Sequence, residues 1–284
     1  MEAVNTRLNV YSNTGGKPGI IQQILIAVAV VVILYIVLSG IESIYRYINR
    51  LSMNRVELLP NTYSTEGKSI TIYQNPADPN AMPITPSNNE RSGPEFTYSF
   101  FIYVNPNSFR AEKGLLHVFH KGNPGQYPLM APGVYMRSDT NCMRVYMNTF
   151  ETWNKYVEID NIPISKWVYV TVICRGMHLE VYINGNLSKK LSFEGYQGYQ
   201  NYGNLYCFSQ RRITVPKRVP SVGDEGFDVF GAMKGMMSRL IYFNYALSYT
   251  EINALMNEGP STKMDSAAMD KPPYLGDDWW TTNY

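Results

Sequence analysis

The chain has 284 residues, of which 45% are hydrophobic and 17% are charged, and its formal net charge at pH 7 is +2. This length accommodates one large all-β domain with accessory segments, or two ordinary domains. A net charge so close to zero creates no strong field and gives no indication of nucleic acid as a partner. The three cysteines, Cys142, Cys174 and Cys207, form no CxxC pair, so we expect buried free thiols and a reducing compartment.

After an N-terminal tail (1–19), the sequence predicts a transmembrane helix over 20–52. No charged residue occurs from Pro18 to Ile41, and Ile24 to Leu38 is apolar throughout. Because a helix needs about 20 apolar residues to cross a bilayer, we prefer a spanning helix to a buried core helix or a signal sequence. Apolar residues recur at helical spacing after Ile41, which predicts that the helix continues as a stalk. The span is represented by Ile20, Leu25, Val30, Leu34 and Leu38.

Basic residues on the two sides of this segment predict its orientation. Arg7 and Lys17 precede it, whereas Arg46, Arg50 and Arg55 follow it. By the positive-inside rule, the C-terminal part of the chain is expected on the cytosolic side.

Residues 53–95 are expected to form an extended, proline-rich arm with an early strand at Ser69 to Asn75. A linker follows that strand and excludes helix through its proline density. Its prolines are Pro76, Pro79, Pro83, Pro86 and Pro94.

Residues 96–259 change to short runs with period-two alternation, separated by Gly, Asn and Pro. Ten such runs without an intervening helical pattern predict a mainly β fold, an antiparallel β-sandwich of the jelly-roll type. Lys166 to Arg175 is apolar on both faces, which is typical of a central strand covered on both sides. Asn184-Gly185 predicts a type I′ hairpin. Ser248 and Glu251 form a capping box for one short helix that ends at Gly259.

The order of these elements resembles the laminin-G-like branch of the concanavalin-A-like lectin/glucanase superfamily. The resemblance rests on Leu116 to Gly122, on Trp167 followed by the Tyr182-Ile183-Asn184-Gly185 hairpin, and on the closing segment Gly235 to Asn257. It implies a jelly-roll sandwich with fold-defining roles for Trp167, Tyr182, Asn184, Gly185, Leu247 and Glu251. Trp167 and Tyr182 are expected to supply core area.

Catalysis is not expected. Glucanases of this superfamily use two carboxylates in an E-x-D-x-x-E strand. The nearest match, Glu158-Ile159-Asp160, has Pro163 at the third position, so we interpret these carboxylates as solvated charges at a strand edge. His117 and His120 are three apart on an expected strand and should face opposite sides, which disfavours a shared metal.

No cofactor is expected, and calcium is retained only as a weak alternative. Family members bind this hard cation through oxygen ligands at the rim of the sandwich. Asp224 and Asp228 are the candidates here, with Asp139 and Glu225 beside them.

Three segments are candidates for contact with a protein partner or a glycan. The loop 195–204 carries Tyr196, Tyr199 and Tyr202 among amides, a composition found in both kinds of site, and we prefer the protein contact. Arg211 and Arg212 belong to a basic run without stacking aromatics, which favours a partner-binding loop over a nucleic-acid site. The C-terminal tail (260–284) carries Trp279 and Trp280, which should dock either on this domain or on a neighbouring protein.

One span followed by a cysteine-poor sandwich is similar to virion proteins of large nucleocytoplasmic DNA viruses. That resemblance implies a non-catalytic minor capsid or virion membrane protein. Such a protein sits in the internal membrane, and its C-terminal domain faces the capsid proteins. The alternative is a carbohydrate-binding, lectin-like module displayed on a membrane.

Overall fold

The computed structural model describes residues 19–67, 69–90, 93–215 and 226–265. The chain divides into two compact units, residues 1–53 and residues 54–284. Each unit is described by itself.

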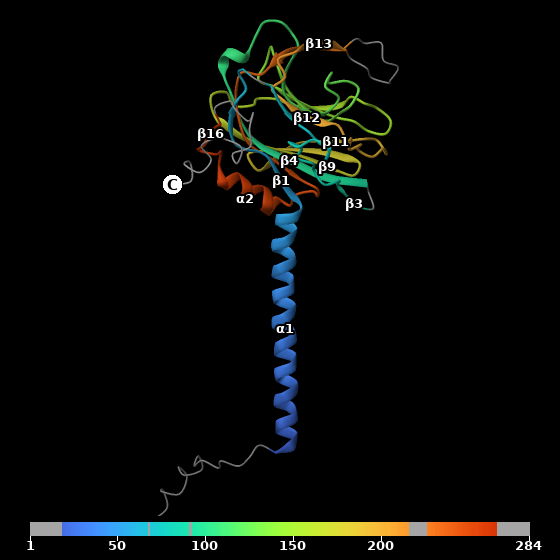
Figure 1. The fold of residues 1–284 in the computed structure, drawn as a ribbon, viewed down its shortest axis with the longest axis vertical. Coiled ribbons are helices and arrows are strands. Elements are labelled where there is room, and N and C mark those ends of the chain that lie inside the picture. The colour runs from blue at the N-terminus through green and yellow to red at the C-terminus, as the bar shows by residue number, and fades with distance from the viewer. Residues whose placement is uncertain (1–18, 68, 91–92, 216–225, 266–284) are drawn as a thin grey trace, which may run out of the picture. The chain divides into compact units, whose positions relative to one another are not determined.

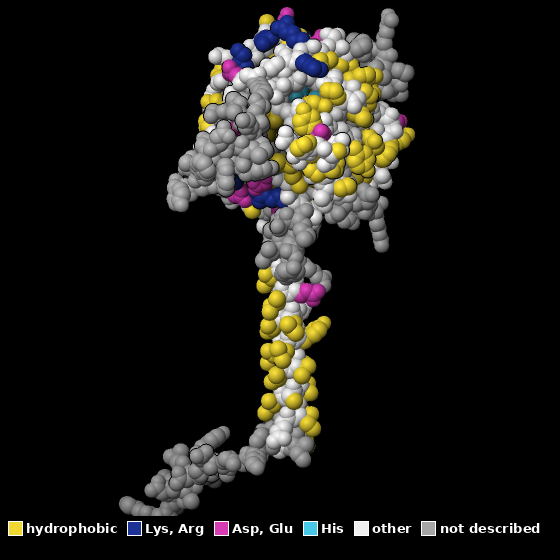
Figure 2. Space-filling view, in the orientation of Figure 1, with side chains coloured by type: hydrophobic (Ala, Val, Ile, Leu, Met, Phe, Trp, Pro, Cys, Tyr) yellow, Lys and Arg dark blue, Asp and Glu magenta, His cyan; other side chains and the backbone are white. Residues whose placement is uncertain are grey.

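The first unit contains one long helix, α1 (Ile20–Met53), in close agreement with the expected 20–52. At about 1.5 Å per residue, its 34 residues extend about 50 Å. The stretch Gln23–Ile44 has a mean hydropathy of 3.1, and none of it is buried. Hydrophobic side chains therefore cover this part of the helix on its visible face (Figure 2). By length and composition the helix can cross a membrane, a test that signal sequences also pass.

The second unit is an antiparallel β-sandwich, as the alternating runs predicted (Figure 1). The described residues form two sheets of eight strands each. The first sheet has the order β11 (Asn186–Ser192), β10 (His178–Ile183), β9 (Trp167–Arg175), β4 (Gly93–Val104), β15 (Gly235–Phe243), β1 (Arg55–Ser64) and β16 (Met264–Asp265), with β3 (Asn88–Glu90) paired to β4. The second has the order β13 (Arg212–Val215), β14 (Phe227–Ala232), β5 (Leu115–Gly122), β6 (Met130–Arg137), β7 (Met143–Met147) and β8 (Lys155–Ile159), with β12 (Asn204–Cys207) joining β5 to β2 (Ile70–Ile72).

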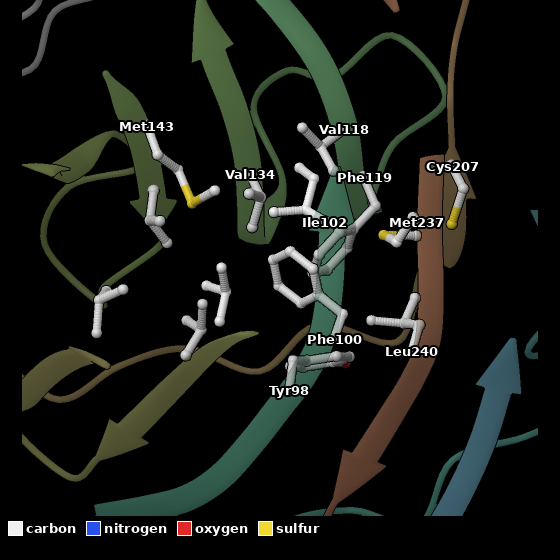
Figure 3. Close-up of a cluster of buried hydrophobic side chains, with 14 of the residues drawn as sticks. Tyr98, Phe100, Ile102, Val118, Phe119, Val134, Met143, Cys207, Met237 and Leu240 are labelled. Atoms are coloured by element: carbon white, nitrogen blue, oxygen red, sulfur yellow. The ribbon is translucent and has the colours of Figure 1, made fainter. Parts of the chain in front are cut away.

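The main hydrophobic core lies between the two sheets. Phe100 of β4 meets Phe119 of β5 edge to face, with ring centroids 5.3 Å apart. Aliphatic and sulfur-bearing side chains from both sheets surround this pair (Figure 3). Such edge-to-face contacts add roughly 0.5–1.5 kcal/mol to the apolar area that they bury.

Strand β9 is covered on both faces, as its double apolar pattern predicted. Val170 and Cys174 point into the core between the sheets, whereas Tyr169 and Ile173 belong to a second cluster on the outer face. Helix α2 (Tyr249–Glu258) closes that cluster.

The capping box that starts α2 is present. The Ser248 side chain accepts from the backbone of Glu251, the Glu251 side chain accepts from the backbone of Ser248, and Gly259 ends the helix with φ 69°. Leu247 is buried in the outer cluster. Trp167 and Tyr182 are only partly buried against this same cluster, so they support α2 rather than the central core.

The hairpin between β10 and β11 turns at Asn184 and Gly185, as predicted. Their φ angles are 48° and 79°, and positive values at both positions are what a type I′ turn requires. The Asn184 side chain also accepts a hydrogen bond from the backbone N–H of Tyr169, at 2.9 Å. Strand β11 is exposed along almost its whole length and forms one edge of the first sheet.

The expectation of an extended arm over 53–95 was wrong for much of this segment. Strand β1 pairs with β15 inside the first sheet, and β2 pairs with β12 in the second. Pro60 lies inside β1, and for this reason the sequence did not indicate a strand there. Proline lacks the N–H that a regular ladder needs, but the register of β1 shifts on both sides of Leu59 and the exposed Pro60 sits in that irregularity. From Tyr73 to Ser87 the chain has neither helix nor strand, as the proline density predicted.

Two further strands, β13 and β14, were not expected. Strand β14 follows the Asp224 to Gly226 segment, whose acidic residues had suggested a metal-binding turn. It pairs with β13 on one side and runs parallel to β5 on the other.

Candidate binding site

One cavity of about 320 Å³ opens on the second unit. The proline-rich segment after β2 forms one wall, and the loop before β12 forms the other. The lining residues are Gln74, Asn75, Pro76, Ile84, Thr85, Pro86, Lys121, Gln200, Asn201, Tyr202 and Asn204. The volume lies at the lower end of the usual range for small-molecule sites, and the lining is unusually rich in amides.

Side-chain amides hold the proline-rich wall in place, because this segment has no ladder of its own. Gln74 donates to the carbonyl oxygen of Met82 at 3.0 Å and accepts from the N–H of Ile84 at 3.0 Å. The carboxamide of Gln200 accepts from the N–H of Ser87 at 2.8 Å and donates to the hydroxyl of Tyr242 at 2.8 Å. The Gln74 bonds hold the proline-rich segment in its own conformation, and the bond between Ser87 and Gln200 ties this segment to the opposite wall.

Lys121, near the end of β5, is buried beneath the opposite wall, with 2% of its surface exposed. Its ammonium group donates to the carbonyl oxygens of Asn201 and Gly203, the latter at 2.9 Å. Asn201 in turn donates from its side chain to the carbonyl oxygen of Lys121 at 2.9 Å. Burial lowers the pKa of Lys121 to about 8, so at pH 7 the group is still mostly cationic.

Exposed aromatic rings accompany the cavity loop. Tyr202 lines the cavity and is 84% exposed. Tyr199 packs edge to face against Phe150, with ring centroids 5.3 Å apart, and Phe150 is itself 68% exposed. An exposed aromatic surface of this kind is typical of a contact site.

The predicted contact residues divide into three groups. Tyr196, Tyr199 and Tyr202 lie on the loop before β12, where Tyr202 reaches the cavity and Tyr196 is exposed outside its lining. Arg211 and Arg212 are exposed at the start of β13 and do not line the cavity. Trp279 and Trp280 lie outside the described residues.

Glu158, the nearest match to a catalytic carboxylate, is held by arginine. It lies on β8, the edge strand of the second sheet. Its Oε1 accepts from Nε and Nη2 of Arg144, at 2.9 and 2.7 Å. Arg144 also stacks on the ring of Tyr156, with 4.3 Å between its guanidinium carbon and the ring centroid. The contacts of Glu158 are those of a structural ion pair.

His117 and His120 were expected on opposite faces of β5, and this was wrong. The pairing of β5 with β6 shifts register between His117 and Phe119, which brings the two rings to the same side. Nε2 of His117 lies 2.8 Å from Nδ1 of His120. The N–H of Ser209 donates to Nδ1 of His117, and Nε2 of His120 bonds to the carbonyl oxygen of Asn123.

These contacts settle the tautomers and leave no lone pair for a metal. Nδ1 of His117 accepts from Ser209, so its Nε2 carries the proton and donates to His120. Burial lowers the pKa of His117 well below its usual value and that of His120 to about 4, so both rings are neutral at pH 7.

The two calcium candidates that the structure describes, Asp139 and Asp228, belong to no group of potential metal ligands. Asp139 accepts two hydrogen bonds from Arg137, at 3.0 and 2.9 Å, and this contact lowers its pKa. Asp228 lies within β14 opposite Thr214, while Asp224 and Glu225 lie outside the described residues. In the described part of the chain, no three His, Cys, Asp or Glu residues are grouped to hold a metal ion.

The three cysteines are free and buried, as expected from the absence of a CxxC pair. Burial raises the pKa of the Cys142 thiol to about 12 and those of Cys174 and Cys207 higher still. Since the thiolate is the reactive form, these side chains act as small core residues.

The sequence did not indicate the part of the cavity that comes from the proline-rich segment and from Lys121. One signal was present: a lysine inside a run that is otherwise buried, Leu115 to Gly122, needs internal partners. Gln74 and Asn75 had no such signal, because their role depends on pairing between distant strands.

No protein-family model and no curated protein sequence matches the chain. Among solved structures, it is similar to the botulinum neurotoxin serotype D binding domain (16% identity, TM-score 0.47, covering 69% of this chain and 41% of that one). It is similar to the binding domain of Paraclostridial Mosquitocidal Protein 1 (16% identity, TM-score 0.43, covering 69% and 42%). It is also similar to the serotype D ligand-binding domain in complex with N-acetylneuraminic acid (12% identity, TM-score 0.46, covering 70% and 42%). The chain thus spans less than half the length of each of these structures, and the likeness assigns it neither a ligand nor an activity.

Proposed function

We propose that this chain is a non-catalytic binding protein that α1 anchors in a membrane. The observation that carries this proposal is the stretch Gln23–Ile44, which has a mean hydropathy of 3.1 and none of which is buried. Water penalises so much exposed apolar surface, whereas a bilayer stabilises it.

The more specific role is that of a minor capsid or virion membrane protein. In this role the β-sandwich lies on the cytosolic side during assembly and joins an internal membrane to the capsid shell. Its support is the resemblance of the architecture to such proteins and the basic residues that follow the span. The exposed rings of Phe150 and Tyr202 provide contact surface for neighbouring proteins.

Cross-linking mass spectrometry on native membranes or particles tests this role. The expected result is a set of cross-links from the loop 195–204 and the tail 260–284 to other chains. Cross-links confined to copies of this chain would contradict a linking role, whereas the membrane anchor would be unaffected.

Membrane flotation tests the anchor separately. The full chain is expected to float with liposomes and to resist alkaline extraction. Leu34→Arg places a charge at the middle of the span and should reduce insertion, since a central arginine costs about 2.5–3.5 kcal/mol. Asn80→Arg, an exposed polar position of the second unit, is the matched control. Recovery of the unaltered chain in the soluble fraction without detergent would overturn the proposal.

A second candidate function is glycan binding by the same membrane-displayed sandwich. The amide-lined cavity with Tyr202 at its rim favours it, because amides bind hydroxyl groups and an aromatic ring stacks on a sugar face. On a glycan array, Tyr202→Ala should weaken binding, whereas Tyr249→Ala, at another exposed tyrosine that lies on α2, should not. An array without any bound glycan would exclude this second function.

A further inference from the structure

The buried cation Lys121 has no carboxylate partner in the described part of the chain. Its two hydrogen bonds go to backbone carbonyl oxygens of Asn201 and Gly203, and burial alone accounts for the shift in its pKa. A lysine ammonium group has three N–H donors, so one donor remains. Burying a charge without an opposite charge is costly, and proteins normally balance such a group.

The other unused hydrogen-bonding groups of the cavity are also donors. Asn75 accepts through Oδ1 from the N–H of Ala77 at 3.1 Å, and Asn204 accepts through Oδ1 from the N–H of Gln74 at 2.9 Å. Their Nδ2 groups have no hydrogen-bond partner among the described residues. In contrast, both ends of the Gln74 and Gln200 carboxamides are already engaged.

The charge of the lining has a single sign. Lys121 is its only ionisable side chain apart from the tyrosine hydroxyl, and none of the lining residues is acidic. A cavity with one ammonium group and unused amide donors is complementary to a ligand that is rich in acceptors and negatively charged. Its volume of about 320 Å³ limits that ligand to roughly the size of one sugar ring.

We propose that this cavity binds a hydroxylated carboxylate of the size of a hexuronic acid, with the carboxylate directed to Lys121 and ring oxygens directed to Asn75 and Asn204. This inference rests on the second proposed function and adds selection for a negative charge. Tyr202 at the rim provides a face on which the ring of the ligand stacks.

Two sugars that differ only in the carboxylate test the inference. The full chain is placed in phosphatidylcholine nanodiscs, and binding of glucuronate and of glucose is measured by calorimetry at pH 7. Glucuronate is expected to bind at least about tenfold more tightly than glucose, the change that one favourable charge contact produces. That preference should decline as pH rises through about 8, where Lys121 loses its proton.

A charge-introducing variant with a matched control localises the effect. Asn75→Asp keeps the acceptor for Ala77, removes the Nδ2 donor that both sugars share and adds a negative charge to the lining, so glucuronate binding should weaken about tenfold more than glucose binding does. Asn80→Asp makes the same change at an exposed position outside the lining and should leave both affinities unchanged. Circular dichroism verifies that both variants keep the β-sandwich. Lys121→Met, if it passes the same check, should abolish the preference for glucuronate.

Three results would overturn the inference. Equal affinities for glucose and glucuronate would exclude selection for charge. If the unaltered chain still bound glucose and Tyr202→Ala lost this binding, the proposed glycan-binding function would nevertheless stand. Acetate binding as tightly as glucuronate would reduce the site to a simple anion site. No binding of any of the three probes, together with a positive glycan array, would place glycan recognition elsewhere on the sandwich.

Discussion

His117 donates a hydrogen bond to His120 across 2.8 Å, inside a strand on which a regular pleat would hold the two rings on opposite faces. Val118 is the residue that the register shift of β5 leaves without a counterpart on β6. The two neutral imidazoles then link the backbone at Ser209 to the backbone at Asn123.

This arrangement predicts loss of stability in mild acid. The pKa of His120 in the folded protein is about 4, that of His117 is also lowered, and an unfolded histidine has a pKa of about 6.5. As pH falls, the unfolded state therefore binds protons before the folded state does. The contribution of the neutral histidine pair to the stability of the fold is complete above pH 6.5 and is lost as pH falls toward 4. Each group contributes up to about 1.4 kcal/mol per pH unit in that window. Thermal unfolding of the full chain in detergent, measured from pH 7.5 to 4.5, checks this slope.

A histidine variant separates this effect from general acid unfolding. His120→Gln is expected to lower stability at pH 7.5 by about 1–3 kcal/mol, since a buried hydrogen-bond partner is altered, and to flatten the acid slope. His178→Gln, a partly exposed histidine of β10, should keep the slope of the unaltered protein. The same slope in all three proteins would contradict the assignment to the pair.

Glu158→Gln is expected to change stability and not catalysis. The substitution removes the charge that pairs with Arg144, at a cost of about 1 kcal/mol for a partly exposed pair. Chemical denaturation measures that loss, and Glu66→Gln, an exposed glutamate without an ion pair in the described structure, is the control. Hydrolysis of a β-glucan by the unaltered chain that disappears in Glu158→Gln would make the protein an enzyme.

The capping box of α2 should contribute measurably to the fold as a whole, because α2 covers the outer face of β9. Ser248→Ala removes the side-chain acceptor for the N–H of Glu251 and is expected to lower stability by about 1 kcal/mol. Ser188→Ala on the exposed strand β11 is the matched control and should have little effect. Equal unfolding midpoints for the two variants would show that the cap is energetically unimportant.

The hairpin turn allows conformational and steric effects to be separated. Gly185 has φ +79°, and an added Cβ would lie 2.6 Å from Oδ1 of Asn253, so Gly185→Ala combines backbone strain with a collision against α2. Gly195 has φ +95° with open space around it, so Gly195→Ala incurs the strain alone, roughly 1–2 kcal/mol. Denaturation should rank Gly185→Ala as the less stable of the two variants. The reverse order would mean that the Asn253 side chain moves away from the added Cβ without any loss of stability.

The sequence was sufficient wherever a local rule determined the structure. The double apolar face of β9, the turn at Asn184 and Gly185 and the cap at Ser248 each follow from neighbouring residues, and each was predicted correctly. Long-range pairing was not predictable in this way. Strand β1 is recognised only beside β15, because Pro60 breaks its pattern and the sheet accommodates the break through register shifts.

The candidate site was predicted only in part for the same reason. The loop 195–204 has a contact-site composition that is visible locally, and Tyr202 does line the cavity. The opposite wall comes from a segment more than a hundred residues earlier, held by hydrogen bonds such as that from Gln74 to Asn204. The mutual orientation of His117 and His120 depends on a register shift in β5, which cannot be predicted from the alternation of side chains along a regular strand.

If α1 anchors the chain in a bilayer, as proposed, copies share a two-dimensional layer and meet often, which gives strand β11 at the edge of the first sheet a further consequence. An uncovered strand edge invites a neighbouring copy to add its own strand. Here that edge carries Lys189 and Lys190, and Lys190 is further fixed by Glu180 at 2.9 Å. An approaching strand would have to dehydrate these ammonium groups, which disfavours edge-to-edge pairing between copies.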